Sequence, residues 1–212
     1  MNNIFHRIWH IIRIPLAIIV ILYIGLVIWR IPAAQERLKT EEVVKKIQAQ
    51  KLTLADVIGQ NLPSEPDSKL KDATIEGIDA NGNGIRDDVE LAIFKLHPDS
   101  ARIRAAELQY AMALQFQFTD VFNTDTFITA IQEDGRGYGC IFDTEPGSYP
   151  DLSKELFEQN KIINERIDEV KNLILNTSKR KFIYENNYDK YMTSYSLLSG
   201  KDCDIDLTSL PN

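Results

Sequence analysis

The sequence predicts a mainly α-helical protein, in which an N-terminal transmembrane helix precedes a small helical bundle with one acidic loop. Two observations support this fold class. Near the N-terminus, an uncharged apolar run is long enough to cross a bilayer. Further along the chain, apolar residues recur at intervals of three and four, which is the spacing of one helix face. Strand-like patterns are scarce and are confined to residues 138–142.

The predicted membrane span covers residues 11–29, from about Ile11 to Trp29. Trp9 and Trp29 bracket it at a separation that corresponds to roughly 30 Å of helix rise, the thickness of a bilayer core. Indole rings favour the two membrane interfaces, so this pair fits a spanning helix. A cleaved signal peptide is the alternative. The sites around Pro32 lack the small residue that cleavage requires at position −3, and we therefore predict an uncleaved anchor.

The orientation of this anchor is indicated by two opposing patterns of charge. Basic residues follow the span closely, and counting them alone favours a cytoplasmic C-terminal domain. They are Arg30, Arg37, Lys39, Lys45 and Lys46. Residues 33–212, however, carry all 31 acidic side chains and a formal charge of −10, and long domains are translocated largely regardless of charge. We expect an inner-membrane protein whose C-terminal domain is periplasmic.

The two cysteines, Cys140 and Cys203, are candidates for a disulfide. Such a bond would stabilise the fold by roughly 4 kcal/mol on the chain-entropy model, and it requires an oxidising compartment. Two buried free thiols are the alternative.

The predicted organisation comprises an anchor (1–32), a helical stalk (33–60), a proline-containing linker (61–78) and a helical domain (79–212). Within the domain, helices are expected over about 87–96, 98–118, 121–131, 152–175 and 178–199. The glycine-rich residues 133–139 are expected to break the third of these helices. The last helix is rich in tyrosine, which suits either a docking face or the core.

The acidic loop, residues 79–90, is the one segment with explicit chemistry. Its residues match the pattern D-x-[DN]-x-[DN]-G-x5-E at every specified position. Gly84 falls at position 6, where the chain turns sharply. The candidate ligands are the side chains of Asp79, Asn81, Asn83, Asp87 and Glu90, and the backbone carbonyl of Ile85. Oxygen ligands of this kind, closed by a bidentate carboxylate at position 12, favour Ca²⁺.

This pattern resembles the calcium-binding loop of an EF-hand, over twelve of the 212 residues. The chain contains no second loop of this kind, and Arg86 occupies position 8, which is usually a branched apolar residue in paired EF-hands. The entering segment, residues 68–78, is also a poor helix. The resemblance therefore implies a single, structural Ca²⁺ site of the type found in extracellular modules. An Asn-Gly turn without an ion is the alternative.

Three classes of function remain open from the sequence. The loop and the anchor together resemble small membrane-anchored envelope proteins of Gram-negative bacteria, which implies an interaction or accessory component of an envelope assembly with a protein partner. A calcium-responsive regulator of a membrane partner is the second class, and an envelope hydrolase with an unidentified site is the third. No catalytic residues are predicted, because His97 has no local catalytic partner. Nucleic acid is not an expected partner of so acidic a domain.

Overall fold

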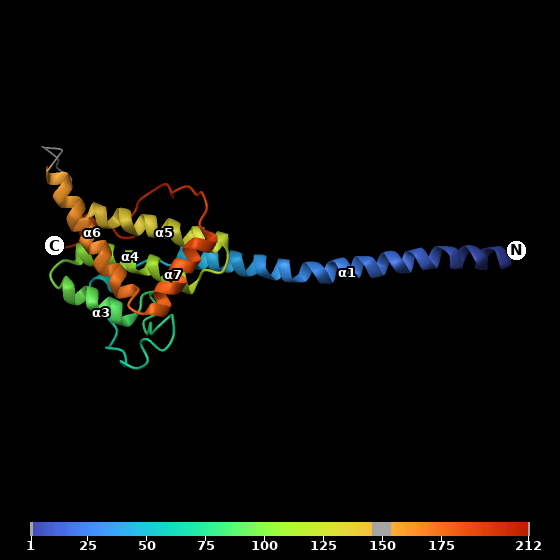
Figure 1. The fold of residues 1–212 in the computed structure, drawn as a ribbon, viewed down its shortest axis with the longest axis horizontal. Helices are drawn as coiled ribbons and strands as arrows, with labels where there is room; N and C mark the ends of the chain where they lie inside the picture. The colour runs from blue at the N-terminus through green and yellow to red at the C-terminus, as the bar shows by residue number, and fades with distance from the viewer. Residues whose placement is uncertain (1, 146–153, 212) are drawn as a thin grey trace. The chain divides into compact units, whose positions relative to one another are not determined.

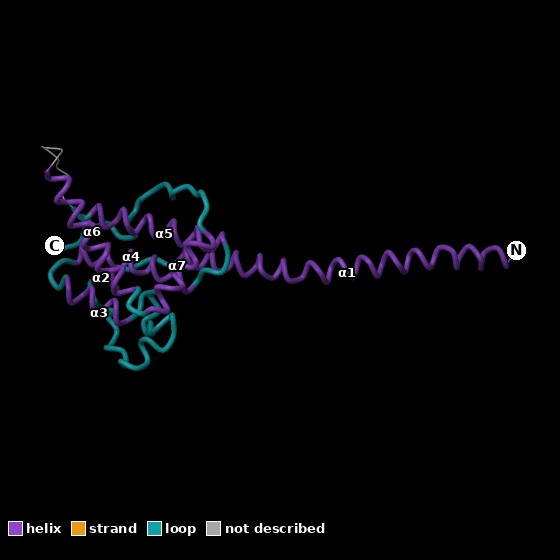
Figure 2. Tube along the Cα trace, in the orientation of Figure 1, coloured by secondary structure: helices purple, strands orange, loops and turns teal. Residues whose placement is uncertain are grey.

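The computed structural model describes residues 2–145 and 154–211, and within these residues it contains α-helices and one short 3-10 helix but no β-strand (Figure 1, Figure 2). The predicted mainly α class, with one long apolar N-terminal helix, is confirmed. The chain divides into two compact units, residues 1–42 and residues 43–212. Each unit is described by itself.

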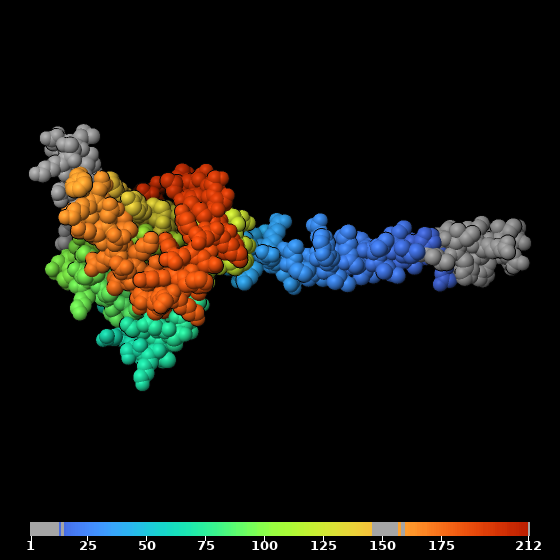
Figure 3. Space-filling model, viewed as in Figure 1, coloured from blue at the N-terminus to red at the C-terminus, as the bar shows by residue number. Residues whose placement is uncertain are grey.

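The first unit consists of helix α1 (Asn2–Ala49) up to residue 42. The helix continues through Pro15 and Pro32, and its side chains from Leu16 to Ile31 are exposed (Figure 3). It is long and apolar enough to cross a membrane, and none of its apolar stretch is buried. A water-soluble protein rarely exposes so much continuous apolar surface. The helix is therefore consistent, by length and composition, with a membrane anchor or a signal sequence.

The second unit is a helical domain built around one central helix. Its helices are α2 (Leu54–Val57), α3 (Asp87–Leu96), α4 (Ala101–Thr119), α5 (Thr124–Asp143), α6 (Lys154–Ile174) and α7 (Ser178–Tyr191), followed by the 3-10 helix η1 (Leu207–Ser209). Every residue of α4 from 104 to 118 is buried, and the other helices of the domain pack around it (Figure 1). A helix that is buried on all sides is the centre of its domain.

Helices α4 and α5 pack closely against each other at Gly137. A Cβ atom at this position would lie 2.8 Å from the Cα atom of Tyr110, which is closer than carbon atoms pack. The close crossing brings the interior residues of α5, among them Ile141 and Phe127, against the core. The close packing of α4 and α5 therefore requires a glycine inside helix α5.

Glutamine side chains on α4 hold the non-helical parts of the domain. Gln109 donates to the carbonyl of Asp202 at 2.7 Å and accepts from the backbone N–H of Asp204 at 2.8 Å. Gln115 donates to the carbonyl of Glu76 at 2.8 Å. Buried polar groups are stable when they are hydrogen-bonded in this way, so these two positions fix the C-terminal segment and the segment before the 79–90 loop.

The C-terminal segment is also joined covalently to α5. The structure links Cys140 and Cys203 by a disulfide with an S–S distance of 2.05 Å and a Cα–Cα distance of 4.8 Å. The neighbouring Asp204 accepts a hydrogen bond from Arg136 of α5 at 2.7 Å. The segment after α7 is thereby fastened to α5 at Cys203 and Asp204.

Two of the predicted helix ends are wrong. Helix α5 continues through residues 133–139 and includes residues 138–142, where a break and a strand-like pattern were expected. Close packing of Gly137 against α4 explains why the glycines are tolerated. Helix α7 ends at Tyr191 instead of near residue 199. Beyond it the chain runs along α5, where Gln132 donates to the carbonyl of Ser196 at 2.8 Å.

The helical domain also begins earlier than the predicted boundary at residue 79. Ile47, Leu52 and Val57 are buried in its core, although the sequence assigned them to a stalk. The expected linker, residues 61–78, contains turns and no α-helix, as the poor helical pattern of its second half indicated. The start predicted for α6, near residue 152, lies outside the described residues.

Candidate metal centre

The 79–90 loop is folded by hydrogen bonds from its own backbone to its acidic and amide side chains. The carboxylate of Asp79 accepts from the backbone N–H groups of Gly82 at 2.8 Å and Gly84 at 2.9 Å. Asn83 Oδ1 accepts from the N–H of Ile85 at 2.9 Å. Gly84 has a φ of +86°, a conformation that favours glycine. The side chains at positions 1 and 5 therefore set the curvature of the loop.

The end of the loop is the start of helix α3. Asp87 accepts from the N–H of Ala80 at 2.9 Å, and its own N–H donates to the carbonyl of Ile78 at 2.8 Å. The two ends of the loop are thus closed on each other. Ile85 is fully buried in the domain core, which anchors the middle of the loop.

Glu90, at position 12, is fully buried with only part of its carboxylate satisfied. Its Oε2 accepts from Asn81 Nδ2 at 3.0 Å, whereas its Oε1 is buried without a hydrogen-bond partner. Burial raises the pKa of this carboxyl group to about 7, against the opposing influence of the Asn81 and Asn83 amides. A buried carboxylate oxygen without a partner is costly. The site therefore suits a cation that would complete the contacts of Glu90.

Hydrogen bonds join some of the predicted ligands in pairs. Asp79 and Asn83 are joined by a hydrogen bond of 3.2 Å from the Asn83 N–H, and Asn81 is joined to Glu90. Within residues 2–145 and 154–211, no three His, Cys, Asp or Glu side chains gather closely enough to hold a metal by themselves. A cation in this loop would depend on amide and backbone oxygens as well, so calcium binding stays a prediction.

Arg86, at position 8, has a role that the sequence did not reveal. Its side chain is fully buried, and its guanidinium donates to both carboxylate oxygens of Asp88 at 2.9 and 3.1 Å. It also donates to the carbonyls of Ile174 at 2.8 Å and Leu173 at 3.0 Å, at the end of α6. The only sequence signal was an arginine at a position where an apolar residue is usual.

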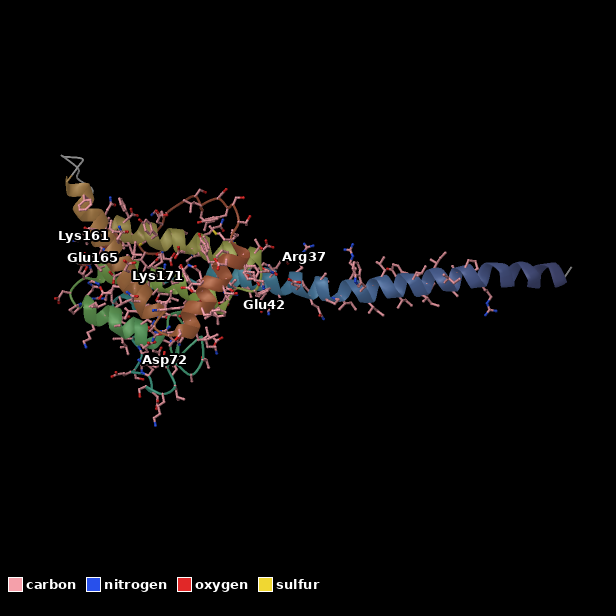
Figure 4. The ribbon with its side chains drawn as sticks, viewed as in Figure 1. Arg37, Glu42, Asp72, Lys161, Glu165 and Lys171 are labelled. Atoms are coloured by element: carbon pink, nitrogen blue, oxygen red, sulfur yellow. A yellow bond between two sulfur atoms is a disulfide. The ribbon has the colours of Figure 1, made fainter. Side chains whose placement is uncertain are left out.

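Arg180, in the first turn of α7, holds the segment that precedes the loop. It is 1% exposed, and it donates to the carbonyls of Ile75 at 2.9 Å and Lys71 at 3.0 Å. It also pairs with Asp72, which is labelled in Figure 4 among the loops before α3. Nothing local in the sequence distinguishes this arginine from its basic neighbours, because its partners lie more than 100 residues away.

A second buried ion-pair network lies at the other end of α3. His97 Nε2 is 2.9 Å from Glu107 of α4, and Arg166 of α6 donates to the same carboxylate at 2.7 Å. Arg166 also donates to the hydroxyl of Thr144 at 2.7 Å. The network connects α3, α4, α6 and the end of α5. His97 thus lies beside Glu107, and Arg166 holds the same carboxylate in a structural ion-pair network.

The chain matches no family model, no curated protein and no solved structure, so its own fold and the 79–90 loop provide the basis for a function.

Proposed function

We propose that the protein is a single-pass inner-membrane protein whose periplasmic helical domain binds a structural Ca²⁺ ion and serves as an accessory component of an envelope assembly. The observation that carries this proposal is Glu90. It is a fully buried carboxylate with an unsatisfied oxygen, at position 12 of a loop whose turns are already formed.

The proposed ligands would supply the hard oxygen atoms that Ca²⁺ requires. Asp79, Asp87 and Glu90 provide carboxylates, and Asn81 and Asn83 provide amide oxygens. The Ile85 carbonyl is the sixth proposed ligand. When bound, the ion supplies positive charge beside Glu90, where the carboxylate is removed from water. The chain itself contributes the turns and the anchoring of Ile85 in the core.

A structural role is favoured over a sensing role by what precedes the loop. Calcium sensors change the angle between two helices that flank the loop. Here only α3 flanks the 79–90 loop, and residues 68–78 form turns. Arg86 and Arg180 hold the flanking segments against α6 and α7. The change in angle between two flanking helices that a sensor uses therefore has no counterpart at this loop.

The periplasmic location is supported by the disulfide and by the ligand set. The bond between Cys140 and Cys203 is typical of oxidising compartments. Three carboxylates in a single unpaired loop suit the affinities of about 10⁻⁴ to 10⁻³ M found in extracellular modules. A reporter fused after Asn212 that is active only in the periplasm tests the location, and activity of a cytoplasm-specific reporter at the same point would contradict it.

An accessory role with a protein partner is supported by aromatic side chains on α7. Phe182 is 67% exposed and Tyr188 is 47% exposed. Aromatic residues are enriched at protein interfaces, where large, rigid side chains bury much area. The sequence expectation that the tyrosine-rich helix presents a docking face is part of this proposal.

Calorimetric titration of the full chain in detergent with Ca²⁺ tests the calcium site. The wild type should bind one ion, and Glu90→Gln should bind at least about tenfold more weakly, because a bidentate charged ligand is lost. Glu165→Gln is the matched control, since this glutamate lies exposed on α6. Equal affinities for the wild type and Glu90→Gln would rule out the ligand assignment.

A further inference from the structure

The turn between α6 and α7 is fastened to both flanks of the 79–90 loop. Arg86, inside the loop, donates to the last carbonyls of α6, at Leu173 and Ile174. Such carbonyls have no partner within their own helix, and the C-terminal end of a helix favours positive charge. Arg180, at the start of α7, donates to Lys71 and Ile75, which precede the loop. One arginine therefore reaches from the loop to the end of α6, and the other reaches from the start of α7 to the segment before the loop.

Arg86 is also fixed to the proposed ligand Glu90 by the backbone. The N–H of Glu90 donates to the carbonyl of Arg86 at 3.0 Å, in the first turn of α3. Asp88, in the same turn, holds the guanidinium of Arg86 through both oxygens. Because one helical turn carries the ligand and the arginine, an ion that fixes Glu90 also fixes the position from which Arg86 reaches α6.

The two arginines pack closely around Gly77. A Cβ atom at this glycine would lie close to the Cδ atom of Arg86 and 3.1 Å from a guanidinium nitrogen of Arg180. Both arginine side chains are almost fully buried, and each makes several hydrogen bonds to backbone carbonyls. The region is therefore a tightly packed connection between the loop and the α6–α7 turn.

We propose that Ca²⁺ binding at the 79–90 loop locks the α6–α7 hairpin onto the domain, with Arg86 as the positioning residue that connects them. The inference rests on the proposed calcium site. By linkage, the same interaction increases the affinity for Ca²⁺ when the hairpin is docked. Release of the ion then loosens the α6–α7 turn before it affects α4 and α5.

Amide hydrogen exchange of the full chain in detergent, with Ca²⁺ or with a chelator, tests this connection. In the wild type, Ca²⁺ should slow exchange of residues 172–180 by about tenfold, which is within the usual range of coupling between sites. Mg²⁺ at the same concentration is the ion control. Slowing confined to residues 79–90 would overturn the inference and leave the calcium site intact.

Arg86→Lys is the variant that separates coupling from charge. It retains the positive charge near the ion but loses the planar fork that reaches two carbonyls and Asp88 together. We expect Arg86→Lys still to bind Ca²⁺, about tenfold more weakly, and to lose the calcium-dependent slowing of exchange at residues 172–180. Arg104→Lys is the matched control, because Arg104 is also buried and donates to the carbonyls of Val57 and His97. It should retain the slowing.

A second variant and a binding measurement separate failure of the coupling from failure of the calcium site. If Arg86→Lys does not fold, Asp88→Asn removes the carboxylate that orients Arg86 and should reduce the same slowing, whereas full slowing in Asp88→Asn would contradict the inference. If calorimetry detects no Ca²⁺ binding to the folded wild type, the proposed function fails and the coupling fails with it. Binding without any effect at residues 172–180 refutes the coupling alone.

Discussion

Asp134 of α5 is a buried carboxyl group that the structure leaves without full hydrogen bonding. Its Oδ1 is buried without a hydrogen-bond partner of standard geometry, and the Gln117 side chain lies beside the carboxyl group. Burial raises the pKa of Asp134 to about 6, although Gln117 and the charge of Lys171 (Figure 4) oppose the rise. The folded state therefore holds this proton more tightly than the unfolded chain, whose pKa is about 3.8.

The raised pKa of Asp134 predicts a pH dependence of stability. Its contribution is fully present below about pH 4 and is lost as the pH rises through about 6, because the buried group must then ionise. Asp134→Asn should raise the free energy of unfolding at pH 8 by up to about 3 kcal/mol, and by much less at pH 4. Urea unfolding at both pH values measures this difference. The exposed Asp189→Asn is the control, and a loss of stability in Asp134→Asn at pH 8 would contradict the assignment.

Substitution by alanine should lower the free energy of unfolding by different amounts at Gly77 and at Gly82. Both have positive φ, +73° and +71°, so alanine introduces backbone strain of about 1–2 kcal/mol at either position. At Gly82 nothing lies within 4 Å of the added Cβ, whereas at Gly77 it meets Arg86 and Arg180. With a chelator present, Gly77→Ala should lose clearly more unfolding free energy than Gly82→Ala. Equal losses would show that the packing around Gly77 is unimportant.

At the scale of the elements, local sequence signals predicted some helices and failed for others. Helix α4 begins after Ser100, whose hydroxyl accepts from the N–H of Ile103, and this start is close to the predicted start at about residue 98. Helix α6 was predicted from a stripe of apolar residues, of which Ile163, Val170 and Ile174 are buried. Such signals involve residues close in sequence. The extent of α5 and the end of α7 depend on contacts with distant segments.

The glycines of α5 show why its continuation could not be predicted. In isolation each glycine disfavours a helix by up to about 1 kcal/mol relative to alanine. Gly137 is nevertheless required where α5 crosses Tyr110, and Gly139 leaves room for the carboxylate of Asp202. The glycines lower the helix propensity of their own segment, whereas the stabilisation comes from packing against residues that are distant in the sequence.

Substitutions at Gly135 and Gly137 should have opposite effects. Gly135→Ala brings a Cβ to 3.1 Å from Leu197 Cδ2, and that side chain is exposed and free to turn away. It should be neutral or stabilise the fold by up to about 1 kcal/mol. Gly137→Ala meets the backbone of Tyr110 and should destabilise the fold by about 1–3 kcal/mol. Thermal unfolding of both variants measures the difference, and a stabilising Gly137→Ala would contradict the close crossing.

At the scale of the whole molecule, the sequence predicted the apolar helix and the candidate ligands but not what surrounds the loop. The candidate ligands follow from a pattern of twelve adjacent residues, so they could be proposed without the fold, and calcium binding stays a prediction. The contacts of Arg86 with α6 and of Arg180 with the segment before the loop span 87 to 109 positions. Contacts of this range leave no local pattern, and the structure was needed to find them.

The effect of calcium on the stability of the whole domain is a direct test of the structural calcium site. We expect 2 mM Ca²⁺ to stabilise the full chain in detergent by about 0.6–1.8 kcal/mol relative to a chelator, for dissociation constants between about 10⁻³ and 10⁻⁴ M. The melting temperature should rise accordingly in the wild type and in Glu165→Gln, but not in Glu90→Gln. An unchanged melting temperature of the wild type with and without Ca²⁺ would contradict a structural calcium site.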